Sequence, residues 1–342
     1  MLSREEYEQL TVSVAGGLVG VGIAIHLDEE TRLPVVTRPI RNSPAQKAGI
    51  RRNDVIISID GDSIEGQNLE SIVDLIRREK DSTITLELQR GDEKLEVKVV
   101  RDQFELMVVN PLSISDDREE TYWADRDAGI GYVHIPSFTR STAPQLKRVL
   151  AQLAQNDMKS LVIDLRVCGG GLLSAATEVV DMFLDEGIIL SSTGRNPDER
   201  TTFRATKGGD YTKLPVVVLI NEYTASAAEI VAACLQDHHR AAMVSQQTYG
   251  RGTVQSVFPL EHGGALKLTT AEWLRPNGRS LLRREGQNDW GVRPDAGLNV
   301  SISEDIHKEL ARQRTSRLNG EDVAEPVKDA QLGKALAFLH LD

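Results

Sequence analysis

The chain has 342 residues, which is too long for one ordinary hydrophobic core and suits about two domains of usual size. Hydrophobic residues make up 40% and charged residues 27%, as in soluble globular proteins and unlike disordered or fibrous ones. Lys and Arg number 40 against 51 Asp and Glu, a net charge of −11, which argues against nucleic acid as a partner.

An uncharged run of about 16 residues, Leu10 to Ile25, could be mistaken for a signal peptide or a membrane span. It follows Glu5, Glu6 and Glu8, is rich in glycine, and falls short of the roughly 20 apolar residues that a spanning helix needs. We predict strand and loop here. The chain as given then shows no targeting segment, and its sequence leaves the compartment open.

Residues 12–105 have the pattern of short strands with turn signals and one helix. Apolar residues at helical spacing predict a helix over Leu69–Arg78. β-Branched or alternating runs predict strands at Val21–Ile25, Leu33–Arg38, Val55–Ile59, Thr83–Gln89 and Leu95–Val100.

After Asp102 the pattern changes to strands that alternate with helices, which predicts parallel pairing with crossover helices. The predicted strands are Ile130–Ile135, Leu161–Leu165 and Val216–Ile220. The predicted helices are Ala143–Gln155, Leu172–Leu184, Ser226–Gln236, Ser303–Leu318 and Asp329–Leu339.

The two cysteines, Cys168 and Cys234, could form one disulfide or none, and neither stands in a metal-ligand spacing. Cys234 lies in an apolar helical stretch, where a small hydrophobic core residue is expected. We expect no metal and no cofactor.

Two glycines stand close together in the run Gly20, Val21, Gly22 and Ile23. Glycine lets the backbone turn so that successive N–H groups converge on an anion, and the following strand offers an edge for a peptide. Such a pair alone more often marks a tight hairpin. With the downstream run from Asn42 to Gly61, however, the segment closely resembles the PDZ family, in which this loop holds a peptide's terminal carboxylate. The resemblance implies that these four residues bind peptide.

A serine, Ser226, follows the strand Val216–Ile220 and opens a helix. There a hydroxyl can be lifted out of the sheet beside the positive helix end, although an ordinary N-cap serine is commoner. The segment, with Glu229 three residues after Ser226, resembles the nucleophile motif of the C-terminal processing (tail-specific) serine proteases. The similarity continues to about residue 300 through Gly129–Tyr132, Asp164–Arg166, Gly170–Leu173, Gly250–Gln255, Ala265–Thr270, Gly278–Ser280 and Arg293–Asp295.

This resemblance implies a mixed α+β chain with a PDZ domain at 12–105 and a crotonase/Clp-protease-like β/α catalytic domain at 106–342. Residues 1–11 would be the remnant of an N-terminal region, whose helices and export signal would belong to a longer native product. The implied activity is a serine endopeptidase that cleaves polypeptides near their C-termini. Its partners would be polypeptides with a free C-terminus, and its location the periplasm or cell envelope.

Site residues are implied position by position. Ser226 would attack the scissile carbonyl, while the backbone N–H of Ala227 and one from the Gly170–Gly171 loop would form the oxyanion hole. In this loop the family's usual Asn-Asn-Pro is replaced by residues 167–169, Val-Cys-Gly.

Relatives carry a general-base lysine 25 residues after the serine and an orienting glutamine four further on. Here those positions hold Arg251 and Gln255. Because arginine stays protonated in proteins, it cannot take the proton that a neutral lysine takes.

Two other functions compete with an active protease. One is a pseudoprotease that keeps the fold and binds peptide termini through the PDZ domain. The other is a nucleotide-binding enzyme built on the strand before Gly169 and Gly171. That second hypothesis fails because the dinucleotide fingerprint needs a third glycine where Ser174 stands.

Overall fold

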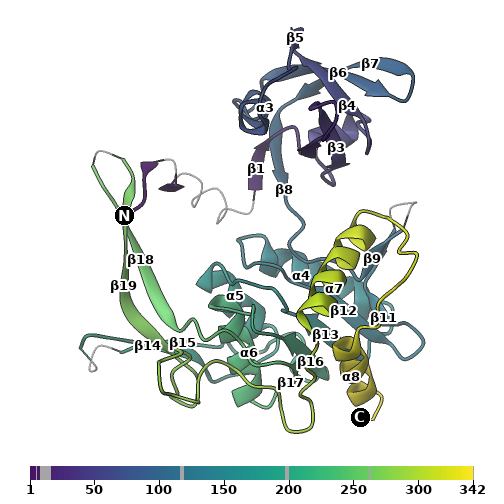
Figure 1. The fold of residues 1–342 in the computed structure, drawn as a ribbon. Coiled ribbons are helices and arrows are strands. Elements are labelled where there is room, and N and C mark those ends of the chain that lie inside the picture. Colours follow the sequence, from purple (N-terminus) through teal and green to yellow (C-terminus); the bar gives the residue numbers. More distant parts are fainter. Residues whose placement is uncertain (5, 8–16, 116–118, 197–199, 262, 342) are drawn as a thin grey trace. The chain divides into compact units, whose positions relative to one another are not determined.

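The computed structural model describes every residue except 5, 8–16, 116–118, 197–199, 262 and 342. The chain forms two compact units, Ala15–Met107 and a larger one that combines Met1–Val14 with Val108–Asp342 (Figure 1). The N-terminal end joins the larger unit through a bridge between Leu2 and Ala265.

The smaller unit is an antiparallel sheet closed by helices. Its strand order is β2-β3-β4-β6-β7, so β2 lies at an edge, and buried isoleucines and leucines of the sheet and α3 form its core. The elements are β1 (Gly17–Gly20), β2 (Ile23–Leu27), β3 (Pro34–Pro39), α2 (Pro44–Lys47), β4 (Val55–Ile59), β5 (Asp62–Ser63), α3 (Leu69–Ile76), β6 (Thr83–Arg90), β7 (Glu93–Val100) and β8 (Asp102–Glu105).

The larger unit is built on a five-stranded sheet of order β11-β12-β13-β16-β17, parallel from β12 to β17. Strand β16 reads Val-Val-Val-Leu-Ile and is buried at every position, because helices cover both faces of the sheet. Its elements are β11 (Trp123–Asp125), β12 (Ile130–His134), α4 (Thr142–Ala154), β13 (Ser160–Asp164), α5 (Leu173–Asp181), β16 (Val216–Ile220), α6 (Ala227–Asp237) and β17 (Ala241–Ser245).

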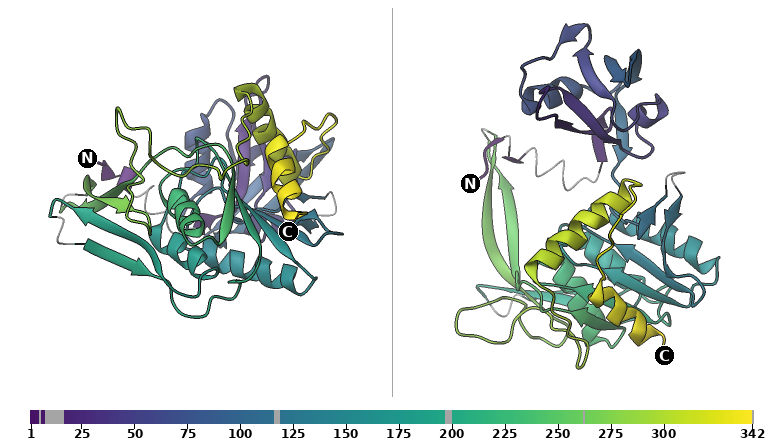
Figure 2. Two further views of the ribbon diagram at one scale, coloured as in Figure 1. Left: turned by 90° about the horizontal axis from the view of Figure 1, so that it is seen from below. Right: turned by 45° about the vertical axis from the view of Figure 1, so that its right-hand side comes forward.

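Alternate residues of the strands feed two separate cores. Helices α4, α5 and α6 pack on one face of the sheet, and α8 packs on the other. Helices α7 (Glu304–Leu318) and α8 (Ala330–Leu339) lie on the same side of the sheet (Figure 2).

A second sheet, of order β15-β14-β19-β18, carries a long hairpin of β18 and β19. The hairpin extends away from the five-stranded sheet, as Figure 1 and the right view of Figure 2 show. The strands are β14 (Ile188–Gly194), β15 (Arg200–Arg204), β18 (Thr253–Pro259) and β19 (Ala265–Leu274), and a small pair is formed by β9 (Ser113–Ile114) and β10 (Glu120–Thr121).

Most predicted elements are confirmed, including the parallel pairing, and the strands Val55–Ile59 and Val216–Ile220 match residue for residue. Strand β2 begins at Ile23, two residues later than predicted, because Gly22 turns the chain at a φ of 78°. The part of the Leu10–Ile25 prediction on residues 10–16 lies outside the described residues. Strands β14, β15, β17 and β18 were not predicted, since they are short or present many polar side chains.

Both cysteines are free and fully buried, so of the two alternatives the chain adopts the one without a disulfide. Cys234 packs in the main core of the larger unit, as predicted.

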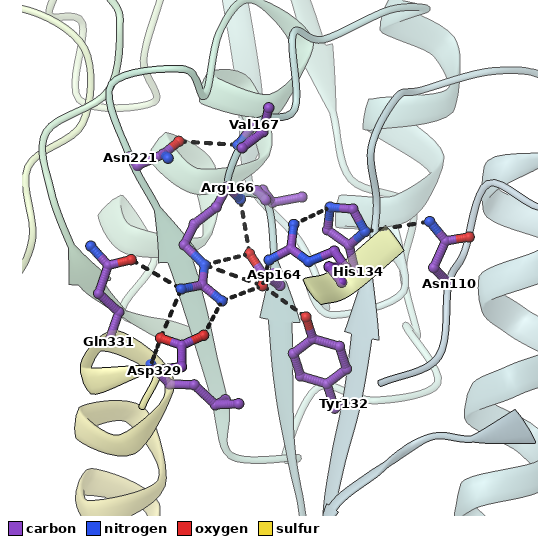
Figure 3. A network of polar contacts seen from close by, with 12 residues as sticks. Asn110, Tyr132, His134, Asp164, Arg166, Val167, Asn221, Asp329 and Gln331 are labelled. Carbon is purple, nitrogen blue, oxygen red and sulfur yellow. Dashed lines mark hydrogen bonds and ion pairs between the residues drawn. The ribbon is translucent and has the colours of Figure 1, made fainter. Parts of the chain in front are cut away.

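A buried polar network fixes the C-terminal helices to the carboxyl end of the parallel sheet (Figure 3). Asp164, the last residue of β13, accepts hydrogen bonds from the Tyr132 hydroxyl at 2.8 Å and from the guanidinium groups of Arg166 and Arg314, the latter on α7. Arg314 also donates to Nε2 of His134 at 3.0 Å. Three separate elements therefore meet at one carboxylate.

His134 ends β12 and is only 6% exposed. Burial and the nearby Arg314 lower its pKa to about 3, with a smaller lowering from Arg166 and an opposing effect of Asp164. The folded chain therefore keeps this imidazole neutral, whereas the unfolded chain protonates it below about pH 6.5.

The unfolded state thus binds more protons between about pH 3 and 6.5, so this group makes the protein less stable as the pH falls through that range. We expect the free energy of unfolding of the larger unit to fall by about 2 kcal/mol from this source between pH 7.5 and 5. His134→Gln should remove that part of the decrease. Chemical denaturation at both pH values measures it, with the exposed His26→Gln as control; equal pH dependence in wild type and His134→Gln would contradict the prediction.

Candidate active site

Ser226 stands between β16 and α6 in a backbone conformation that is unusual for a residue with a side chain. Its φ is 56° and its ψ is −120°, in the region that favours glycine. Non-glycine residues held in such conformations concentrate at active sites, where the surroundings sustain the strain. Ser226 is half-buried, and its backbone N–H donates to Oε2 of Glu229 at 2.9 Å.

The glycine loop after β13, which contains Gly170 and Gly171, is in close contact with Ser226. A Cβ on Gly170 would lie 2.8 Å from Cβ of Ser226 and 2.9 Å from the nitrogen of Ala227. A Cβ on Gly171 would lie 2.1 Å from the carbonyl oxygen of Phe138. Both positions also have a positive φ, so only glycine allows this approach.

The backbone N–H groups of Ala227 and Gly171 have no hydrogen-bond partner among the described residues. The N–H of Gly170 is differently engaged, because it interacts with the Cys168 thiol. Burial raises the pKa of that thiol to about 12, and the Gly170 interaction opposes the rise. Cys168 is therefore a protonated packing residue. Among the described residues two unpaired donors remain: the N–H of Ala227, next to Ser226 in the chain, and that of Gly171, next to the glycine that contacts Ser226.

Glu229 is the residue that joins the parts of this site. Its carboxylate is fully buried and accepts four hydrogen bonds. The donors are the Ser226 N–H at 2.9 Å, the Thr248 hydroxyl at 2.6 Å, the Gly250 N–H at 2.7 Å and the Arg251 N–H at 2.8 Å. Burial raises the pKa of Glu229, and these four hydrogen bonds oppose that rise.

Residue 251 is placed next to the serine by its backbone. The N–H groups of Ser226 and Arg251 share Oε2 of Glu229, so their nitrogen atoms lie at most about 6 Å apart. The Arg251 guanidinium is exposed and lies 5.2 Å from the Tyr249 ring centroid. Among the described residues it makes no hydrogen bond or ion pair.

Gln255 does not join this arrangement. Its amide, on β18, donates to the hydroxyls of Thr269 at 2.6 Å and Thr253 at 3.3 Å. It makes no hydrogen bond with Arg251 in the part of the chain that the structure describes. The structure therefore brings Ser226, Ala227, Gly170, Gly171 and the backbone of Arg251 together.

Sequence reasoning used Glu229 only as a marker of the serine motif. The signal for its role was present, because a glutamate three residues after an N-cap serine is the spacing at which a side chain reaches back to the cap N–H. The donors from Thr248 and Gly250 have no comparable signal, since they lie about 20 residues downstream.

In the smaller unit, the predicted peptide-binding residues line a pocket of about 160 Å³ at the free edge of β2. Among the described residues, the N–H groups of Val21 and Gly22 have no hydrogen-bond partner. The carbonyls of both residues accept hydrogen bonds. Apart from Val21 and Gly22, the wall of the pocket is mainly apolar. It consists of Val19, Gly20, Ile23, Ile25, Ile40, Val73, Ile76, Arg77 and Phe104.

None of the helices in the described ranges is both long enough and apolar enough to cross a membrane. Within the same ranges, no three His, Cys, Asp or Glu side chains are grouped so that they could hold a metal ion.

Comparison with protein families gives two matches. Residues 129–298 match the model of peptidase family S41, and residues 35–90 match a PDZ domain model. The first match contains the serine, the glycine loop and Glu229, and the second contains most of the sheet of the smaller unit.

Individual relatives cover nearly all of the chain. It is 34% identical over 347 aligned positions to a carboxy-terminal-processing protease of Bartonella bacilliformis, an alignment with 100% of this chain and 75% of the relative. It is 28% identical to the carboxy-terminal processing protease CtpA of Bacillus subtilis, with 96% of this chain and 72% of the relative aligned.

A solved structure, the photosystem II D1 C-terminal processing protease, superposes with a TM-score of 0.50 at 27% identity and covers 94% of this chain and 82% of that protein. The predicted mixed fold, a PDZ domain joined to a protease domain, is confirmed. The chain therefore belongs to peptidase family S41, among the PDZ-containing carboxy-terminal processing proteases.

Proposed function

We propose that this chain is a serine endopeptidase that cleaves polypeptides near their C-termini, with Ser226 as its nucleophile. One observation carries the proposal: Ser226 is held in a strained conformation against Gly170, and Glu229 ties it to residue 251. The division into a peptide-binding domain at 12–105 and a catalytic domain at 106–342 is part of the same proposal.

The oxyanion of the tetrahedral intermediate would be bound by the N–H groups of Ala227 and Gly171. Both lack partners among the described residues, and both belong to segments that meet at Gly170. Ala227 also opens α6, so the positive end of the helix favours a developing negative charge. One such donor typically contributes about 100- to 1000-fold in rate.

The PDZ domain would capture the substrate's free C-terminus. The unpaired N–H groups of Val21 and Gly22 would receive the carboxylate, and the edge of β2 would pair with the extended peptide. The pocket beside them is lined mostly by aliphatic side chains, so it suits an apolar terminal residue.

Arg251 limits the rate in this proposal, because arginine stays protonated and cannot serve as a general base. The position of its backbone next to Ser226 is that of the family's lysine, but its guanidinium is exposed beside Tyr249. This observation favours the second candidate function, a catalytically impaired protein that binds peptide termini through its PDZ domain.

From the family resemblance we further propose a location outside the cytoplasm, in the periplasm or cell envelope. Cell fractionation of the native gene product tests it, and recovery with cytoplasmic proteins alone would contradict it.

Replacing Arg251 by lysine tests the chemistry. Hydrolysis of an unstructured peptide by the native chain should be very slow or absent, since loss of a general base costs about 100- to 10,000-fold. Arg251→Lys should raise kcat, and adding Ser226→Ala should abolish the gained activity. Steady-state kinetics of the purified proteins measures both steps.

Arg126→Lys is a matched control, because Arg126 also stacks on an aromatic ring, that of Trp123 at 5.1 Å, away from the site. It should leave the rate unchanged. Cleavage by the native chain that neither Arg251→Lys nor Ser226→Ala alters would identify a different nucleophile.

Peptide capture is tested by comparing one peptide with a free and with an amidated C-terminus. The amide should bind more weakly, since it lacks the charge that the N–H groups of Val21 and Gly22 would receive. Gly22→Ala should weaken binding of the acid, because its Cβ would lie 2.2 Å from Cβ of Ser43.

Gly91→Ala controls for backbone strain, because Gly91 also has a positive φ, of 58°, but open space around it. Calorimetric titration gives the affinities. Equal affinity for the acid and the amide would refute capture through the carboxylate.

A further inference from the structure

Arg166 immediately precedes the glycine loop, and its guanidinium is almost completely buried at 4% exposure. Every one of its donors is used. Nε and one N–H of Nη2 donate to Asp164, at 3.0 and 2.7 Å. The other N–H of Nη2 donates to Oδ2 of Asp329 at 2.9 Å, and one N–H of Nη1 donates to Oδ1 of Asp329 at 3.0 Å. The second N–H of Nη1 donates to Oε1 of Gln331 at 3.0 Å.

Asp329 is also the N-cap of α8. Its Oδ1 accepts the N–H of Leu332 at 2.9 Å while both oxygens receive Arg166. The start of the last helix and the side chain before the glycine loop are therefore held by one carboxylate (Figure 3). Charge-assisted two-point contacts of this kind are strong and directional.

The loop that follows Arg166 is also held by other hydrogen bonds: the Cys168 N–H donates to the Leu165 carbonyl at 3.1 Å, and the Gly170 carbonyl accepts the Phe138 N–H at 2.9 Å. The Val167 N–H donates to Oδ1 of Asn221 at 3.0 Å, and the Cys168 carbonyl accepts the Ala225 N–H at 2.9 Å. Val167 itself has a φ of 64°, a strained conformation for a β-branched residue. Such a conformation persists only if its surroundings hold it in place.

Charge within the network is balanced. Asp164 and Asp329 face Arg166 and Arg314, two anions against two cations, and His134 beside them is neutral. Removing one carboxylate leaves a buried guanidinium under-compensated, which is unfavourable in a low-dielectric site. Arg166 would then have to shift, and the glycine loop with it.

We propose that Asp329 is a positioning residue for proteolysis: from the N-cap of α8 it fixes Arg166 and thereby the conformation of residues 167–171, which present the oxyanion donor. This rests on the proposed function of that loop. The start of the C-terminal helix is thus a part of the support of the proposed active site, and Asp329 lies 163 residues away in sequence from the Arg166 that it holds.

Asp329→Asn is the variant of choice, because asparagine caps a helix as well as aspartate does, while the negative charge that faces Arg166 is lost. Asp237→Asn is the matched control. Asp237 forms a buried pair with Arg275 at 2.6 Å, in which the carboxylate side chain is 7% exposed against 20% for Asp329. Asp237 lies at the C-terminal end of α6, about 15 Å along the helix from Ser226. Gln331→Ala, which removes only one acceptor of Arg166, serves if Asp329→Asn fails to fold.

Hydrogen–deuterium exchange of the native full chain, followed by mass spectrometry, gives a readout that does not require turnover. The amides of residues 167–171 should exchange about tenfold faster in Asp329→Asn than in wild type. In Asp237→Asn their exchange rate should equal that of wild type. Unchanged exchange in Asp329→Asn, or equal acceleration in both variants, would overturn the proposal.

Turnover is then compared in the Arg251→Lys background. Asp329→Asn should lower kcat about tenfold with little change in KM, because a donor to the transition state is misplaced while peptide capture is intact. A rise in KM alone would also overturn the proposal. If Arg251→Lys itself is inactive, the proposed proteolysis fails, whereas the exchange result still decides the role of Asp329.

Discussion

The ion pair of Asp164 and Arg166, at the carboxyl end of β13, is the interaction on which the larger unit depends. A buried charge is tolerated only when it is paired and hydrogen-bonded, and here both groups are fully engaged. Their remaining partners come from β12, α7 and the segment that opens α8. Movement of any of these elements would leave a buried charge with fewer ion pairs or hydrogen bonds, so the pair defines where the sheet, the C-terminal helices and the glycine loop meet.

A second buried carboxylate, Glu229, does for Ser226, the proposed nucleophile, what Asp164 does for the loop. All four of its donors come from the start of α6 or from residues 248–251, so its oxygens hold these segments at a fixed separation. Asp164 ends β13, and Glu229 lies in the first turn of α6, the helix that follows β16, so both carboxylates lie near the carboxyl ends of parallel strands. Sites in such sheets form at this edge, because successive strand ends converge there.

In the function that we propose, the role of Glu229 explains how the chain can carry arginine at the position where the family resemblance implies lysine. The contact is made by the backbone N–H of Arg251, which any residue but proline would supply. The geometry of the site is therefore independent of the side chain, whereas proton transfer depends on it entirely. A substitution at residue 251 can therefore impair the proposed chemistry while the fold and the proposed peptide capture persist.

Local patterns in the sequence were enough to predict the elements that frame the site. Fully apolar runs such as Val216–Ile220 indicate strands buried on both faces, and the step from such a strand into a helix located Ser226. The order of the motifs along the chain predicted the family, the glycine loop and the replacement of the expected general base at residue 251. These signals are readable because each depends on residues only a few positions apart.

The tertiary structure alone decided which distant groups complete the site. Asp329 meets Arg166, and Thr248 meets Glu229, because the chain path returns to the carboxyl edge of the sheet, and no periodicity records such a return. Gln255 is bonded to Thr269 because the hairpin pairs β18 with β19, a contact set by strand register and not by spacing from the serine. Burial turns these polar contacts from weak surface interactions into strong constraints, and it exists only once the helices have packed on the sheet.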